Sequence, residues 1–203
     1  MPDYFIFADI IGIMAFAISG FLIAIKNNLD ILGIVIASAL TALGGGIIRD
    51  AILSSPPYAF TSIHPALTLI LTILVAYFFK FYQESSIERK WMFVISDTIG
   101  LVAFSITGAL LAINAEYNFF GIVILSFITA VGGGVTRDIM INEVPTVLVS
   151  DFYGSIAVIV ALVLGTLNFF DAINEFTIII TASFSIVLRL IAYKKGWQLP
   201  KLS

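Results

Sequence analysis

Long apolar segments separated by short polar stretches dominate this sequence. Seven of them have about 20 mostly apolar residues, the length a helix needs to cross the roughly 30 Å hydrocarbon layer of a bilayer. They lie at residues 5–25, 32–53, 63–82, 92–113, 120–141, 147–168 and 175–193. Only 11% of the residues are charged, and a soluble domain carries about 25%, so most of the exterior must face lipid. The sequence therefore predicts an all-α integral membrane protein with seven transmembrane helices, forming one membrane domain over residues 1–203.

Basic residues at the ends of the apolar segments and between them gather on one side of the predicted topology. If the segments alternate in direction, that side holds Lys26, Lys80, Arg89, Lys90, Lys194, Lys195 and Lys201, and the loops of the other side hold no Lys or Arg. Loops rich in Lys and Arg are retained in the cytoplasm. The distribution predicts an outside N-terminus and a cytoplasmic C-terminus, with Trp91 and Trp197 in the aromatic belt at the inner boundary.

The sequence repeats itself. Residues 9–57 align without gaps to residues 97–145, and roughly half of the aligned pairs are identical. Apolar helices match one another readily by chance, but a Gly-Gly-Gly-x-x-Arg-Asp string at 44–50 and again at 132–138 does not. The repeat therefore reflects two related halves.

Each half contains three apolar segments, so the second half must enter the membrane from the opposite side. We expect repeat one at about 5–82, repeat two at about 92–168, and an extra helix at about 175–193. This inverted-repeat plan is common in transporters and channels, whose functional sites lie near mid-membrane where the halves meet.

Each half also has a glycine triplet inside its second segment, comprising Gly44, Gly45, Gly46 and Gly132, Gly133, Gly134. Because glycine costs about 1 kcal/mol relative to alanine in a helix, three in a row predict a point where the helix kinks or unwinds. Close packing of helices is the alternative explanation. A polar stripe on the same helix faces favours a pore wall or a binding cavity, and it consists of Ser38, Thr41, Ser126 and Thr129.

Charged residues lie within the predicted spans. Such charges are costly and usually pair or mark a pathway, so we expect two symmetry-related ion pairs that line or gate a pore, Asp9 with Arg49 and Asp97 with Arg137. The alternative is that both arginines extend to the headgroups, as long cationic side chains can. Arg189, near the inner end of the last segment, is expected to be an anchor of that kind.

The doubled glycine–arginine–aspartate string, the two repeats and the seventh segment resemble the trimeric intracellular cation (TRIC) channel superfamily over essentially the whole chain. Its prokaryotic branch overlaps the family also labelled glycine transporter. The resemblance implies a homotrimer in a prokaryotic plasma membrane, with one pore per subunit lined by the two glycine-kinked helices, Arg49 and Arg137 near it, and potassium and sodium as permeant ions. The Lys-Glu-Val tripeptide of eukaryotic members is absent, so their lipid regulation is not carried over.

The residues leave two transport functions open. A passive monovalent cation channel is the leading hypothesis, and a secondary transporter for a small zwitterion such as glycine is the alternative, since both use inverted repeats. A non-conducting scaffold explains the polar stripes poorly. With one histidine and no cysteine, no nucleophile–base–orienting triad can be assembled, so we expect neither an enzyme nor a cofactor. The expected partners are potassium and sodium ions and membrane lipid, with no nucleic acid, because the basic residues form no patch for it.

Overall fold

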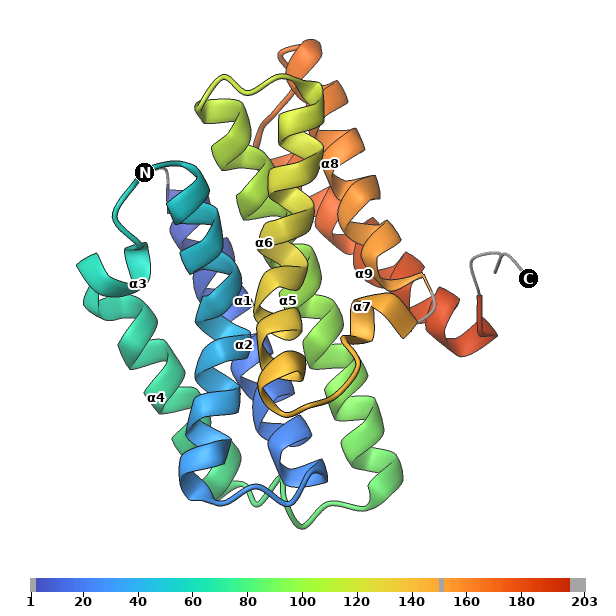
Figure 1. Ribbon diagram of the computed structural model, residues 1–203. Coiled ribbons are helices and arrows are strands. Elements are labelled where there is room, and N and C mark those ends of the chain that lie inside the picture. Colours follow the sequence, from blue (N-terminus) through green and yellow to red (C-terminus); the bar gives the residue numbers. More distant parts are fainter. Residues whose placement is uncertain (1–2, 150–151, 198–203) are drawn as a thin grey trace.

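The computed structural model describes residues 3–149 and 152–197. Within those ranges the chain forms nine α-helices and no strand (Figure 1). Their bounds are α1 Asp3–Lys26, α2 Ile31–Ile52, α3 Tyr58–Thr61, α4 Ile63–Phe78, α5 Ser86–Asn114, α6 Phe119–Met140, α7 Thr146–Val149, α8 Tyr153–Phe169 and α9 Glu175–Lys195. The all-helical membrane fold expected from the sequence is confirmed.

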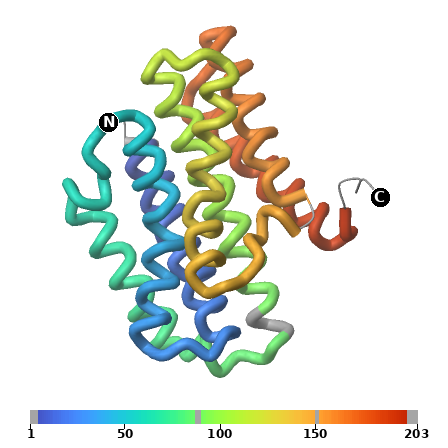
Figure 2. The backbone as a smooth tube through the Cα atoms, in the orientation of Figure 1, coloured from blue at the N-terminus to red at the C-terminus, as the bar shows by residue number. Residues whose placement is uncertain are grey.

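The helices form two halves with the same internal arrangement. In the first half α1 packs on α2 and α4, and in the second half α5 packs on α6 and α8. The halves join through α1 against α5 and α2 against α6, and α2 and α6 run in opposite directions (Figures 1 and 2). Helix α9 has no counterpart in the first half and lies against α5 and α8.

Five of these helices are long and apolar enough to cross a membrane: α1, α2, α5, α6 and α9. The other two apolar helices, α4 and α8, have 16 and 17 residues, or about 25 Å at 1.5 Å per residue. The predicted span 63–82 was too long, because the chain turns at Lys80, whose φ is 56°. The predicted span 147–168 also began too early, since the short α7 and a left-handed Phe152 precede α8.

Equivalent local signals start the second helix of each half. The Asp30 side chain accepts a hydrogen bond from the backbone N–H of Gly33 at 2.7 Å, and Asn118 accepts one from Gly121 at 2.9 Å. Such N-caps satisfy backbone donors that the first helical turn leaves free. The same capping position in both halves therefore fixes the register of α2 and α6, which carry the glycine triplets.

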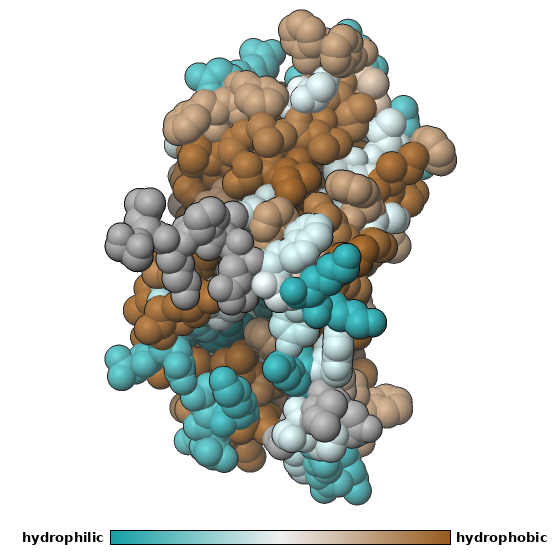
Figure 3. Space-filling view, turned by 90° about the vertical axis from the view of Figure 1, so that its right-hand side faces the viewer, coloured by the Kyte–Doolittle hydropathy of each residue, from teal (hydrophilic) through white to brown (hydrophobic). Residues whose placement is uncertain are grey.

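The exterior is apolar and the interior holds many polar groups. Large side chains such as Phe7 and Phe176 are 68% and 71% exposed, and Figure 3 shows an extensive hydrophobic surface between hydrophilic patches. The hydroxyls of Ser38, Thr41 and Ser126 are fully buried. This distribution is that of a multi-pass membrane protein, because only lipid makes such an exterior favourable.

Residues from the predicted basic side come together at one end of the fold. Lys26 at the end of α1, Lys90 in α5 and Tyr193 near the end of α9 line one groove. Lys201 and the side chain of Arg89 lie outside the described residues.

Candidate functional site

The glycine triplets are where α2 and α6 contact each other. A Cβ atom added at Gly45 would collide with the backbone carbonyl oxygen of Thr129, and one at Gly133 would collide with that of Thr41. A Cβ at Gly44 would lie 3.1 Å from the Gly133 Cα. Only glycine allows this approach, so the triplets bring the two halves into direct backbone contact near the middle of the bundle.

The helices do not unwind at these glycines in this structure. Both α2 and α6 remain α-helical through Gly44–Gly46 and Gly132–Gly134. Backbone contact across the interface compensates for the low helix propensity of glycine. In this structure the triplets therefore make a close helix contact, and a kink at either triplet stays a prediction.

The predicted polar stripe is also packed and does not line open space. Ser38 and Thr41 donate to the backbone carbonyls of Ile34 and Ala37, at 2.8 and 2.6 Å. Thr129 donates to Leu125 at 2.6 Å, and Ser126 donates across to Ser105 in α5 at 2.7 Å. All four stripe residues are fully buried, because Gly20 of α1 and Gly108 of α5 let the neighbouring helices close over them.

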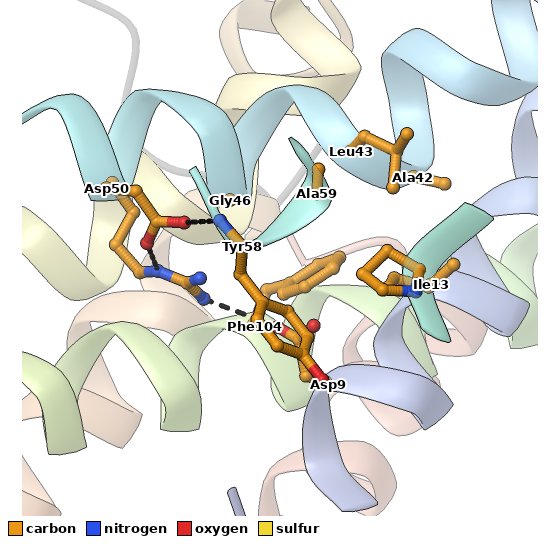
Figure 4. Close-up of a pocket in the computed structure, with 11 residues that line it drawn as sticks. Asp9, Ile13, Ala42, Leu43, Gly46, Asp50, Tyr58, Ala59 and Phe104 are labelled. Carbon is orange, nitrogen blue, oxygen red and sulfur yellow. Dashed lines mark hydrogen bonds and ion pairs between the residues drawn. The ribbon is translucent and has the colours of Figure 1, made fainter. Parts of the chain in front are cut away.

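Arg49 is the centre of one charged cluster, which we call the Arg49 cluster: Asp9, Arg49, Asp50 and Thr107. Its Nε donates to Asp50 Oδ1 at 2.8 Å, and its Nη1 lies 3.3 Å from Asp9 Oδ1. Nη1 is also 3.5 Å from the Thr107 hydroxyl of the other half. The cluster borders a small cavity of about 10 Å³, the room that one water molecule needs, and Figure 4 shows Asp9, Asp50 and Tyr58 around it.

Arg137 is the centre of the equivalent cluster in the second half, which we call the Arg137 cluster: Asp97, Arg137, Asp138 and Ser19. Arg137 Nε and Nη2 contact Asp138 Oδ1 at 2.8 and 2.7 Å. Its Nη1 lies 3.4 Å from the Ser19 hydroxyl, which donates to Asp97 Oδ1 at 2.9 Å. Ser19 belongs to the first half, so this cluster also bridges the halves.

The two predicted ion pairs therefore have different outcomes. Asp9 and Arg49 are in direct contact, whereas among the described residues the Ser19 hydroxyl stands between Asp97 and Arg137. Both arginines are 1% exposed, so neither extends to the headgroups. Buried guanidinium groups need such partners because an unpaired charge at membrane depth costs several kcal/mol.

Asp50 and Asp138 hold the loop that follows each second helix. Asp50 Oδ2 accepts from the backbone N–H of Tyr58 at 2.8 Å, and Asp138 Oδ2 accepts from that of Thr146 at 2.7 Å. Tyr58 and Thr146 are the first residues of α3 and α7. Each Arg-Asp dipeptide thus ties the end of α2 or α6 to the start of the next helix.

Sequence reasoning missed the hydroxyls and Tyr153 of α8 around these clusters, and it gave Arg189 of α9 a different role. Ser19 and Thr107 are uncharged and occur in apolar helices, but they occupy equivalent positions in the repeat, and that was the usable signal. Arg189 is 5% exposed and lies over the Tyr153 ring at 5.3 Å, so it is not the headgroup anchor that was expected. Tyr153 in turn interacts with Asp97.

This geometry places one charged cluster on either side of a glycine contact. Arg49 and Arg137 each follow their glycine triplet by about one helical turn. Because α2 and α6 are antiparallel (Figure 1), the clusters lie toward opposite ends of the same interface. The two ends of the α2–α6 interface thus each carry a buried arginine held by a carboxylate.

Comparison with known proteins agrees with this architecture. The protein-family model described as glycine transporter matches residues 6–81 and 94–168, one stretch in each half. The Bacillus subtilis UPF0126 membrane protein YvgT is 33% identical over 96% of this chain and 95% of its own length. The Escherichia coli UPF0126 inner membrane protein YadS is 31% identical over 95% of this chain and 93% of its own length.

Solved structures share the fold. One of them, described as the structural basis for conductance through TRIC cation channels, superposes on this chain with a TM-score of 0.84 and is 35% identical in sequence. The match covers 97% of this chain and 96% of that one. A prokaryotic TRIC channel crystallised in 0.5 M KCl superposes with a TM-score of 0.87 and is 31% identical, and the match covers 98% of this chain and 100% of that one. These neighbours are ion channels and not enzymes. The chain belongs to the prokaryotic branch of the TRIC superfamily, within the family also described as glycine transporter.

Proposed function

We propose that this protein is a passive channel for monovalent cations, potassium and also sodium, with one pore in each subunit of a homotrimer. Its place would be a prokaryotic plasma membrane, with the N-terminus outside and the C-terminus in the cytoplasm. The observation that carries the proposal is the α2–α6 interface, where backbone contact at Gly45 and Gly133 separates two buried charged clusters. The structural similarity to cation channels supports it.

In this proposal the structure is a closed state of the pathway. Ions would pass between α2 and α6, and the contact of Gly45 with Thr129 and of Gly133 with Thr41 closes the route. When the helices separate or kink at the triplets, the backbone carbonyls and the stripe hydroxyls would face the opening. These oxygens offer weak, neutral ligands, which suit rapid passage and modest selectivity among monovalent cations.

The arginines would act as gating groups at the two ends. A free arginine would repel cations, but Arg49 lies between the carboxylates of Asp9 and Asp50. Arg137 is held by Asp138 and the Ser19 hydroxyl. Each guanidinium also contacts a hydroxyl of the opposite half. Movement of the halves would therefore break or remake these contacts, which couples the clusters to the glycine interface.

Ion flux in proteoliposomes tests the proposal. Purified protein should carry a voltage-driven potassium flux without amino acid, and should carry sodium at a comparable rate. The family description favours one other function, transport of glycine, which predicts saturable glycine uptake coupled to an ion gradient. Such uptake without potassium flux would replace the channel model, and absence of both would reject transport.

A further inference from the structure

A second recess lies away from the α2–α6 interface, where the end of α1 meets the beginning of α5 and the last turns of α9. It has a volume of about 640 Å³, within the range of small-molecule sites. We call it the basic groove, and it is lined by Leu22, Ile23, Ile25, Lys26, Asn28, Ser86, Lys90, Phe93, Val94 and Tyr193.

The groove is amphipathic along the helix axes. Lys26, Asn28, Ser86 and Lys90 provide cations and hydrogen-bonding groups at the helix ends. Leu22 and Val94 lie deeper along α1 and α5 and form an apolar wall. None of the described residues that line the groove is Asp or Glu. The described lining itself therefore offers these two lysines no carboxylate partner.

An aromatic pair closes the α9 side of the groove. The rings of Tyr193 and Trp91 meet edge to face with centroids 5.6 Å apart. Tyrosine and tryptophan favour the membrane–water interface, so the polar end of the groove belongs at headgroup depth and the apolar wall at acyl-chain depth. A ligand that fits must have an anionic head beside an apolar tail.

We propose that the basic groove binds an anionic phospholipid. Its phosphate would lie between Lys26 and Lys90, with the Tyr193 hydroxyl and the Asn28 amide as hydrogen-bonding groups, and one acyl chain would run along Leu22 and Val94. A zwitterionic lipid carries its own cation and gains less from two lysines. A soluble phosphate lacks the chain that the apolar wall accommodates.

Lipid-dependent stability of the whole protein in detergent tests this assignment, and it requires no ion flux. Added phosphatidylglycerol should raise the Tm by about 4 °C more than phosphatidylcholine at the same concentration. The double substitution Lys26→Gln and Lys90→Gln should remove that difference and weaken phosphatidylglycerol binding at least about tenfold. Inorganic phosphate or glycerol 3-phosphate should have no comparable effect.

The matched control is Lys194→Gln with Lys195→Gln, which removes two charges near the end of α9 from residues that do not line the groove. This variant should keep the preference for phosphatidylglycerol. If both double variants lose it equally, the effect is general surface charge and the groove assignment is wrong. Stabilisation by free phosphate, or a change of oligomeric state in the groove variant, would also overturn it.

Should the double variant fail to fold, Lys90→Gln alone, analysed by native mass spectrometry for co-purified lipid, decides the question. Loss of phosphatidylglycerol relative to the parent supports the site, and unchanged retention contradicts it. Because binding is measured directly, its failure leaves the channel proposal standing, and failure of ion flux leaves the lipid site standing.

Discussion

The Arg49 and Arg137 clusters occupy equivalent positions in the two halves, yet they satisfy their arginines differently. Arg49 contacts two carboxylates, Asp50 at 2.8 Å and Asp9 at 3.3 Å. Among the carboxylates of the described residues, Arg137 contacts Asp138 directly, through two guanidinium nitrogens, and reaches Asp97 through the Ser19 hydroxyl. The repeat thus reproduces the Arg-Asp dipeptide and the capped loop but not the second carboxylate contact.

The surroundings of each cluster explain the difference. In the first half, Pro65 borders the cavity beside Asp9 and Arg49, and proline offers no hydroxyl. Helix α9 brings Arg189 over the Tyr153 ring at 5.3 Å, and both residues interact with Asp97. Asp97 therefore has partners other than Arg137, whereas Asp9 has its main charged partner in Arg49. The ninth helix, which packs on α5 and α8, therefore makes the two ends of the α2–α6 interface unequal.

The largest expected effect is the loss of stability in Asp138→Asn, which should exceed the loss in Asp50→Asn. Asp138→Asn leaves the buried Arg137 without a direct carboxylate, whereas after Asp50→Asn the Asp9 contact remains. Breaking a buried pair costs about 3–5 kcal/mol, so we expect that loss for Asp138→Asn and about half of it for Asp50→Asn. Thermal unfolding in detergent gives both values. Equal losses would mean that the hydroxyl bridge is as effective as direct contact.

A control for this comparison is Asp30→Asn. It removes a carboxylate from the N-cap of α2 but keeps a capping side chain, as the natural Asn118 of the second half does. Its effect on the free energy of unfolding should stay below about 0.5 kcal/mol. A larger loss would show that charge removal alone destabilises the protein.

Much of the fold could be predicted from the sequence, because the membrane imposes a length on each apolar segment. Five of the predicted spans agree with helices α1, α2, α5, α6 and α9, although α5 begins earlier than expected. The shortened α4 and α8 could not be predicted from hydropathy. Their limits depend on the left-handed residues Lys80 and Phe152, at which no glycine signals the turn.

The second prediction concerns the glycine contact that both clusters flank. Gly45→Ala and Gly133→Ala each place a Cβ against a backbone carbonyl of the opposite helix. Each should lower the free energy of unfolding by about 3 kcal/mol, and the two losses should be similar if the interface is symmetric. In Gly46→Ala the nearest atom to the Cβ is Arg49 Nη2 at 3.7 Å, so this matched control should be neutral or stabilising by up to about 1 kcal/mol. Unfolding measurements on the three variants decide.

These glycines also show the limit of sequence reasoning at the site. A glycine triplet is compatible with a soft helix and with a close helix contact, and the polar stripe favoured the first. The contact itself is visible only in the facing carbonyls of Thr129 and Thr41. The Asp9–Arg49 contact followed from the requirement that buried charges pair. The Ser19 bridge did not, because the repeat makes Ser19 and Thr107 equivalent but does not indicate which charged residue either hydroxyl faces.

The third prediction tests asymmetry where α1 meets α5. A Cβ at Gly100 would collide with the Phe16 ring, whereas one at Gly12 would lie 3.2 Å from the Phe104 ring. The two rings pack on each other with centroids 5.3 Å apart, so they cannot both move freely. Gly100→Ala should cost about 2 kcal/mol and Gly12→Ala less than about 1 kcal/mol, both measured by thermal unfolding. The reverse order would contradict the packing described here.

The smallest predicted effect tests the bridging hydroxyl itself. Ser19→Ala removes the 2.9 Å donor to Asp97 and the 3.4 Å contact to Arg137, whereas Thr107→Ala removes only a 3.5 Å contact to Arg49. Losing a buried hydrogen bond to a charged group costs about 1.5–3 kcal/mol, so Ser19→Ala should lose about 1.5 kcal/mol and Thr107→Ala well under 1 kcal/mol in the same unfolding assay. Ser19→Thr keeps the hydroxyl and serves as the control. A larger loss of stability in Thr107→Ala than in Ser19→Ala would contradict the assigned asymmetry. It would mean that the Asp9–Arg49 pair depends on the Thr107 hydroxyl more than the Asp97–Arg137 pair depends on the Ser19 hydroxyl.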